Sequence, residues 1–352
     1  MAFLRLIISA CLLLACTVAQ ATSVVFLNPG RSDEAFWVEY SAYMQQAADD
    51  LGIDLEVRYG ERTAQGILDL ARDVLARKQK PDYLLFVNEQ FVGPEILRMY
   101  VGSGIKLFSV HSTLTPEQQM ITGGSRDKYS NWIGSLVPND EEAGYLMAKA
   151  LIELTPAGVG EMIAFSGIKQ TPSATLREVG LQRALNEHPH VRLRQLVYGE
   201  WFEQRAYEQA STLLPRYPQV NLVWSANDNM AFGVMRAARE QGRALRYSGL
   251  NNSVAALQAR VDGRLSVLSS GHFILGGCAL VMVHDYAAGL DFATRGGKDQ
   301  MARLFRLLDA QQARRLLRNL QASGSKLDFK RFSAARNPRL QRYDFSIDAL
   351  LR

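Results

Sequence analysis

The segment Val223-Trp-Ser-Ala-Asn-Asp-Asn-Met-Ala-Phe-Gly-Val-Met-Arg-Ala237 decides the fold of this chain, because it joins a predicted strand to a predicted helix. The strand covers 222–225, a short and largely apolar run that is typical of a parallel sheet covered by helices on both faces. Asp228 stands where the N-cap of the helix is expected, since a short acidic side chain can accept a bond from a free backbone N–H. The segment therefore predicts one strand–helix unit with polar residues at its turn.

Units of the same kind recur along the chain on both sides of this segment. A first group of predicted strands comprises 23–27, 54–59, 83–87, 106–110 and 132–137. A second group comprises 160–165, 191–198, 222–225, 246–250 and 265–269. A polar stretch, 113–131, interrupts the alternation within the first group. The pattern predicts an α/β fold: two doubly wound parallel-sheet lobes joined by a hinge, with a ligand cleft between them.

The order of the units assigns each part of the chain to a lobe. We expect residues 22–137 and 272–306 to form the N-terminal lobe, because an apolar helix at 273–288 returns to it. Residues 138–271 and 307–352 are expected to form the C-terminal lobe, whose last part, from the basic helix at 311–320 onward, packs on that lobe as a strap. Three crossings would join the lobes, near 137–139, 270–272 and 306–309.

Composition and charge exclude several classes of protein. The chain has 352 residues, and 40 basic against 35 acidic side chains leave a net charge of +5, which is too small to indicate a nucleic-acid partner. Apolar residues at 47% and charged residues at 21% are ordinary for a globular protein and exclude collagen-like, coiled-coil and multi-span membrane structures. We expect a monomer.

The N-terminus resembles an export signal. Arg5 precedes an uncharged apolar run, 6–15, and Ala19-Gln20-Ala21 has the small residues that signal peptidase requires. The run is too short to span a bilayer. We expect residues 1–21 to be a signal peptide cleaved after Ala21, and the mature protein to lie in the periplasm. A lipoprotein signal, with Cys16 lipidated, is the alternative.

Polar and aromatic side chains that follow predicted strands are the candidates for a binding site. In open parallel sheets the ligand lies beyond the carboxyl ends of the strands, so two such sheets facing each other create a cleft lined by loops of both. The site residues expected on this ground are Phe36, Trp37, His111, Arg177, Trp201, Asn227, Asn251 and His272.

Three stretches resemble the type I periplasmic solute-binding proteins, specifically the group of ribose-, galactose- and autoinducer-2-binding proteins. The segment 223–237 is similar to that family's strand, Asn-Asp turn and helix. Phe36-Trp37 is similar to its aromatic pair after the first strand, and Thr171-Pro-Ser-Ala-Thr-Leu-Arg-Glu-Val-Gly-Leu-Gln182 to its arginine-bearing helix start. The resemblance covers about 23–308 and implies the two-lobed fold of that family.

The resemblance also implies roles for the site residues. Phe36, Trp37 and Trp201 would sandwich the faces of a sugar-like ring, which suits aromatic side chains because a sugar offers apolar C–H faces. Arg177 would grip ring or hydroxyl oxygens, and Asn227 would hydrogen-bond hydroxyl groups. On this interpretation, replacing Arg177 with alanine should weaken binding and leave the unliganded melting temperature nearly unchanged.

This chain departs from the family pattern at three places. Asn251-Asn252 stands where ribose binders carry an aspartate, His272 stands at their hinge glutamine, and His111-Ser112 replaces their usual Asp-Arg pair. These exchanges change the hydrogen-bonding groups, so a specificity other than ribose is expected.

Each candidate also has a structural interpretation that the sequence leaves open. Phe36 fits the core stripe of its helix, and Trp201 could pack between the lobes. Arg177 could form a surface salt bridge, while Asn227 could serve only as a turn residue.

No motif indicates catalysis or a metal centre. The chain lacks a phosphate-binding loop, a Gly-x-Ser-x-Gly elbow and a His-Glu-x-x-His helix. His188-Pro189-His190 is interpreted as a solvated loop, because proline separates the two histidines, so no cofactor or metal is expected. Cys278 lies in an apolar helix, as a buried thiol would.

The function expected from these observations is binding rather than catalysis. The protein would capture a small polar, sugar-like ligand by closure of its lobes and deliver it to the membrane permease of an ABC-type importer. A ligand-sensing role with a sensor kinase or chemoreceptor is the alternative. A periplasmic hydrolase is the third hypothesis.

Overall fold

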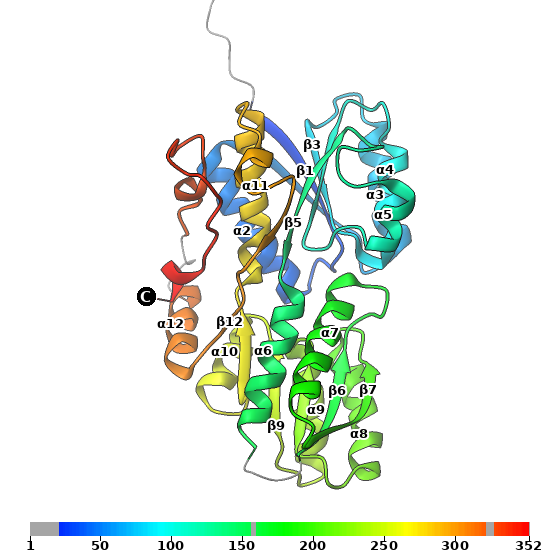
Figure 1. The fold of residues 1–352 in the computed structure, drawn as a ribbon, viewed down its shortest axis with the longest axis vertical. Coiled ribbons are helices and arrows are strands. Elements are labelled where there is room, and N and C mark those ends of the chain that lie inside the picture. The colour runs from blue at the N-terminus through cyan, green and yellow to red at the C-terminus, as the bar shows by residue number, and fades with distance from the viewer. Residues whose placement is uncertain (1–20, 156–159, 322–326, 352) are drawn as a thin grey trace, which may run out of the picture.

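The computed structural model describes residues 21–155, 160–321 and 327–351, which form two α/β lobes arranged one above the other (Figure 1). Each lobe is built on a six-stranded sheet. The expected fold class, two doubly wound parallel-sheet lobes, is confirmed.

The sheet of the N-terminal lobe has the order β11-β5-β4-β3-β1-β2, and all its neighbouring strands are parallel. Its strands are β1 (Thr22–Asn28), β2 (Ile53–Tyr59), β3 (Tyr83–Phe86), β4 (Lys106–Val110), β5 (Trp132–Pro138) and β11 (Asp299–Ala302). Its helices are α2 (Ala35–Leu51), α3 (Ala64–Ala76), α4 (Gly93–Met99), α5 (Pro116–Thr122) and α11 (Leu275–Ala287). α2 and α11 cover one face of the sheet, whereas α3 and α4 cover the other (Figure 1).

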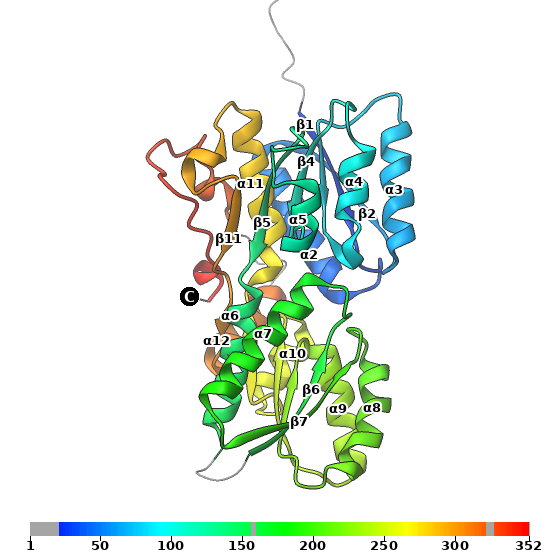
Figure 2. The ribbon, with the colours of Figure 1, turned by 45° about the vertical axis from the view of Figure 1, so that its right-hand side comes forward.

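The sheet of the C-terminal lobe has the order β12-β10-β9-β8-β6-β7, and only β12 runs antiparallel to its neighbour among the described strands. Its strands are β6 (Gly160–Ser166), β7 (Val191–Tyr198), β8 (Leu222–Ser225), β9 (Arg246–Leu250), β10 (Val267–Ser270) and β12 (Arg306–Leu307). Its helices are α6 (Asp140–Glu153), α7 (Pro172–Glu187), α8 (Glu203–Arg216), α9 (Asp228–Glu240), α10 (Val254–Val261) and α12 (Ala310–Gln321). α6 and α7 pair on one side of the sheet, and α8 and α9 on the other (Figure 2).

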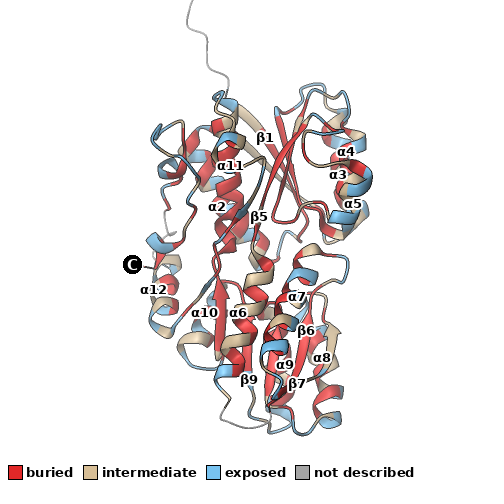
Figure 3. Cartoon of the chain, in the orientation of Figure 1, coloured by how far each residue is buried: buried red, intermediate tan, exposed pale blue. Residues whose placement is uncertain are grey.

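The central strands are buried on both faces, as their apolar runs predict. Every residue of β3 and of β8 is buried, and Figure 3 shows buried positions concentrated along the sheets and the inner sides of the helices. The ten predicted strands agree with the observed ones within two residues.

Three elements lie outside the predicted pattern. α5 occupies part of the polar stretch 113–131, and its start is fixed by a capping box between Thr115 and Gln118. β11 has two exposed residues among its four, and it is a strand because Asp299 to Ala302 pair with β5. β12 contributes only two residues, which pair with β10. Long-range pairing defines both short strands, so local sequence could not reveal them.

The chain crosses between the lobes at three places in the region before α12. The first lies where β5 ends at Pro138 and α6 begins at Asp140. The second follows β10, after which α11 packs on α2 of the N-terminal lobe. The third joins β11 to β12 through residues 303–305, slightly before the expected position near 306–309.

The strap does not keep to the C-terminal lobe, and the expectation that it would is corrected here. α12 packs on α10 of that lobe, but residues 327–345 lie on the N-terminal lobe, where η4 (Phe329–Phe332) contacts α2 and α11. The backbone N–H of Phe329 donates to Asp50 Oδ2 over 3.0 Å. The chain then returns to α12, where Asn319 Nδ2 donates to the carbonyl of Leu350 over 2.8 Å. Burial of the strap's apolar side chains against α2 and α11 explains this course.

Export remains a prediction. The predicted signal peptide covers residues 1–21, and its first 20 residues, which include the alternative lipobox cysteine Cys16, lie outside the described residues. None of the described helices is both long and apolar enough to cross a bilayer.

Candidate functional site

A cavity lies between the lobes at the carboxyl ends of the strands, and we call it the central cavity. It encloses about 40 Å³. All eight residues expected in a binding site line it. The full set is Glu34, Phe36, Trp37, Arg62, Glu89, His111, Thr171, Ser173, Arg177, Trp201, Asn227, Asn229, Asn251 and His272.

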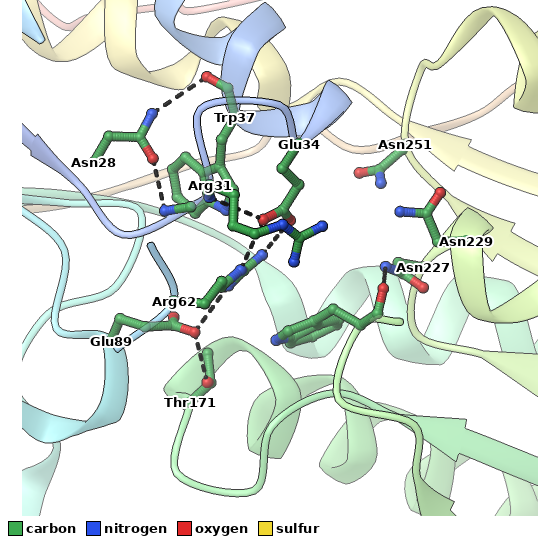
Figure 4. Close-up of polar contacts among 12 residues, drawn as sticks. Asn28, Arg31, Glu34, Trp37, Arg62, Glu89, Thr171, Asn227, Asn229 and Asn251 are labelled. Carbon is green, nitrogen blue, oxygen red and sulfur yellow. Dashed lines mark hydrogen bonds and ion pairs between the residues drawn. The ribbon is translucent and has the colours of Figure 1, made fainter. Parts of the chain in front are cut away.

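The two lobes touch each other beside this cavity. Thr171 Oγ1 of the C-terminal lobe donates to Glu89 Oε1 of the N-terminal lobe over 3.2 Å (Figure 4). The Arg31 guanidinium carbon lies 4.8 Å from the ring centroid of Phe202, again from lobe to lobe. The structure is therefore in a closed arrangement.

A buried ion network that sequence reasoning did not select forms one wall of the cavity. Arg62 follows β2, and its Nε donates to Glu34 Oε2 over 2.9 Å while its Nη1 donates to Glu89 Oε1 over 2.9 Å (Figure 4). Burial lowers the pKa of Arg62, but the two carboxylates outweigh it and leave the pKa raised. Arg62 thus stays charged and fixes both acids. The available sequence signal was a polar side chain in the loop after predicted strand 54–59, which is the kind of position from which the other candidates were chosen.

An aromatic group from the N-terminal lobe and the second crossing forms another wall. The rings of Phe36 and His272 stack with centroids 4.6 Å apart, and Trp37 meets His111 edge to face at 5.1 Å. Phe36 is half-buried and Trp37 is buried. Phe36 therefore belongs to the cavity, not only to the core stripe of α2.

Both histidines of this wall are neutral. Burial, followed by the nearby charges of Arg177 and Arg62, lowers the pKa of His111 to about 3. Burial and the same Arg177 charge lower the pKa of His272 well below its ordinary value. A neutral imidazole offers one donor and one acceptor, so each ring can contact a hydroxyl group in either sense.

Arg177 is a buried ion-pair partner in the C-terminal lobe. Its Nε and Nη2 atoms each lie 2.7 Å from Asp140 Oδ1, and its Nη1 donates to the carbonyl of Ala226 over 2.8 Å. Arg177 and Asp140 are 3% and 2% exposed, so the surface salt bridge considered from sequence is excluded. This ion pair argues against the expectation that removing Arg177 would spare stability, because Asp140 would be left as an unpaired buried charge.

The asparagines of the cavity differ in the hydrogen bonds that they form. Asn227 caps α9 by accepting from the N–H of Met230 over 3.0 Å, and its Nδ2 donates to the carbonyl of Trp201 over 3.2 Å (Figure 4). Asn227 therefore has the structural role at the turn that the sequence left open, and it is the N-cap of α9 in place of the predicted Asp228. Asn251 Nδ2 donates to Asp228 Oδ1 over 2.7 Å, which leaves its Oδ1 for a ligand. Asn229, which was not predicted, also lines the cavity.

Backbone strain concentrates around this cavity. Of the described non-glycine residues with positive φ, four line it, namely Arg62, His111, Trp201 and Asn251, and two more, Glu61 and Glu200, are chain neighbours of these. Such conformations cost free energy and persist where the fold holds a side chain for a purpose. The outliers therefore favour this cavity as the candidate functional site.

The arrangement suits binding of a neutral polar molecule. Four buried ring nitrogens on cavity residues have no hydrogen-bond partner within the described residues: Trp37 Nε1, Trp201 Nε1, His111 Nδ1 and His272 Nδ1. The described residues contain no group of three or more His, Cys, Asp or Glu that could hold a metal ion. Cys278 is a buried free thiol in α11.

Two doubly wound lobes, joined by crossings at the hinge and closed over a polar and aromatic cavity, define the class of two-lobed solute-binding proteins. Residues 24–290 match the family model described as periplasmic binding protein domain. The chain belongs to this family, which confirms the resemblance seen in the sequence.

Individual relatives agree with this assignment. A solved structure described as a periplasmic sugar-binding protein from Pseudomonas fluorescens is 55% identical, covers 94% of this chain and 100% of that chain, and superposes with a TM-score of 0.86. The ribose import binding protein RbsB of Salmonella typhimurium is 26% identical over 70% of this chain and 79% of its own length. The D-allose-binding periplasmic protein of Escherichia coli is 23% identical, and the match spans 59% of this chain and 65% of that relative, just under two thirds. These relatives are described as binding proteins, in line with the non-catalytic function expected from sequence.

Proposed function

We propose that this protein binds a neutral sugar in the periplasm between its two lobes and delivers it to an ABC-type importer. The observation that carries the proposal is the central cavity, which combines aromatic faces with unpartnered ring nitrogens contributed by both lobes. The relative that is 55% identical to this chain is described as a periplasmic sugar-binding protein, which supports the same ligand class.

Charge at the site favours a neutral ligand. Arg62 is already paired with Glu34 and Glu89, and Arg177 is paired with Asp140. No cation of the central cavity is left without a carboxylate partner among the described residues, so a phosphate or carboxylate group on the ligand would lack a counter-charge and be costly to bury. Sugar phosphates and sugar acids should therefore be rejected.

Ligand capture depends on opening and closure of the two lobes about the hinge. A sugar ring is larger than the few water-sized spaces of the closed cavity, so it can enter only when the Thr171–Glu89 and Arg31–Phe202 contacts open. A ligand that then contacts both lobes stabilises the closed state by those added contacts. The closed state is the form that a membrane permease would recognise.

A thermal-shift panel tests the proposal. The probes are D-ribose, D-allose, L-arabinose, D-galactose and D-glucose, with D-ribose 5-phosphate and D-glucuronate as charged controls. We expect at least one neutral sugar to raise the melting temperature by mass action and both charged controls to leave it unchanged. A shift with the charged compounds alone, or with none of the compounds, would contradict the proposal.

A further inference from the structure

A second and larger cavity adjoins the central one, and we call it the side cavity. It encloses about 600 Å³, which lies within the range of small-molecule pockets. His111 and Ser173 line both cavities, so the two spaces adjoin at these residues. A ligand held in the central cavity would meet the side cavity at His111 and Ser173.

The wall of the side cavity is mainly apolar and comes from both lobes. The N-terminal lobe contributes Phe91, Leu114 and Pro116, and the C-terminal lobe contributes Pro172 and Leu176. Closure of the lobes brings these two sets together. An apolar group placed there would lose contact with water only in the closed state, and it would thereby favour closure.

The backbone at Phe91 has a conformation that costs free energy. Its φ is +62° and that of the preceding Gln90 is +48°, a conformation that bulky residues rarely adopt. Two glutamines hold this turn: Gln118 Nε2 donates to the carbonyl of Phe91 over 3.1 Å, and Gln90 Nε2 donates to the carbonyl of Arg62 over 2.7 Å. Phe91 and Leu176 are each 42% exposed. Both side chains are therefore exposed enough to contact an apolar group placed in the side cavity.

We infer that the ligand carries an apolar substituent that occupies the side cavity, so that the physiological ligand is a glycoside with an apolar aglycone rather than a free monosaccharide. This inference rests on the proposed function. The sugar ring would lie among the aromatic and polar groups of the central cavity, and the aglycone would contact Phe91 and Leu176.

The test compares methyl and phenyl β-glycosides of D-galactose, D-glucose and D-ribose by isothermal titration calorimetry, with the free sugars beside them. We expect the phenyl glycoside of the sugar that binds to be about tenfold tighter than the methyl glycoside, because only the phenyl ring fills the side cavity. In Phe91→Ala and in Leu176→Ala, this ratio should fall towards one. Val179 lies on the same helix as Leu176, is 48% exposed and does not line the side cavity. The Val179→Ala variant should therefore keep the affinity ratio of the wild type.

The outcomes separate the two proposals. If a free sugar or methyl glycoside binds but the phenyl glycoside is no tighter, or if the ratio survives both substitutions, the inference is overturned while the proposed function stands. If no sugar and no glycoside binds, the proposed function fails and the inference falls with it.

Discussion

At the scale of single residues, the site depends on charges that are buried and paired before any ligand arrives. Arg62 orders Glu34 and Glu89, whereas Arg177 is held by Asp140 and the carbonyl of Ala226. The protein therefore presents fixed dipoles and rings to the ligand instead of free charges, which lowers the cost of ordering on binding.

Arg177 should consequently matter for folding as well as for binding. Arg177→Ala leaves Asp140 buried and unpaired, so we expect a loss of about 3–5 kcal/mol in the free energy of unfolding. Arg183→Ala is the matched control, since Arg183 lies on the same helix with its side chain 40% exposed and pairs with Glu141; its loss should stay below about 1 kcal/mol. Urea denaturation without ligand measures both, and equal losses would contradict the structural role of Arg177.

The neutral histidines predict a pH dependence of stability. The pKa of His111 is about 3 in the folded chain and near the ordinary value of 6.5 when unfolded, so between these values the unfolded chain binds more protons. The stability that the fold owes to a neutral His111 is fully present above pH 6.5, and it is lost as the pH falls towards 3.

Replacing His111 with glutamine should therefore reduce the acid sensitivity of the fold. We expect His111→Gln to show a smaller loss of unfolding free energy between pH 7.5 and pH 5 than the wild type. His190→Gln, at an exposed position, serves as the control and should behave like wild type. An unchanged pH dependence in His111→Gln would mean that His111 is not buried as a neutral ring.

Sequence reasoning succeeded where a polar or aromatic side chain lies in the loop, or in the first helical turn, that comes after a strand. That rule brought Phe36, Trp37, Trp201 and His272 to one cavity, because parallel strands end at a common edge. Arg62 also follows a predicted strand, but its importance depends on Glu34 and Glu89, which approach from other loops, and sequence alone did not show that they would meet it. Nor could it show that Arg177 was paired, since Asp140 lies on a different helix. The roles of all these cavity residues in ligand binding remain predictions.

At the scale of elements, the strand–helix rhythm was sufficient to locate the units of both lobes. It failed for β11 and β12, which are strands only by pairing with distant partners. It also failed for the strap, whose alternating polar and apolar residues do not say which lobe they will cover.

The strap is fastened to α11 by one buried carboxylate. Asp285 accepts from the N–H of Ala334 over 2.6 Å and from the Tyr343 hydroxyl over 2.9 Å, and Ser333 also donates to it. These hydrogen bonds and the neighbouring His284 outweigh the effect of burial, which raises the pKa of Asp285, and leave that pKa lowered. The carboxylate therefore stays ionised as an acceptor.

Removing that carboxylate should loosen the strap locally. For Asp285→Ala we expect faster amide hydrogen exchange in 329–345 and a loss of about 1–3 kcal/mol in the free energy of unfolding, because buried donors lose their acceptor. Asp344→Ala, an exposed carboxylate in the strap itself, should change neither quantity. Protection that persists in Asp285→Ala would show that apolar burial alone holds the strap.

At the scale of the whole molecule, the lobes, crossings and strap form a hinge that a ligand can bias. Small-angle scattering should show the unliganded protein more open on average than the closed structure, and saturation with the sugar that binds should reduce its radius of gyration. Trp201→Ala at saturation should compact less, since its lobe would lose a ring contact. Equal compaction in the two proteins would remove Trp201 from the closure mechanism.

The central claim is that one neutral sugar is held by both lobes at once. The most direct measurement is calorimetric titration of that sugar into the wild type, Trp37→Ala and Trp201→Ala, which alter one lobe each. We expect one site in the wild type and a loss of about 3–5 kcal/mol of binding free energy in each variant if the site is fully dehydrated. Unchanged affinity in both variants would contradict it.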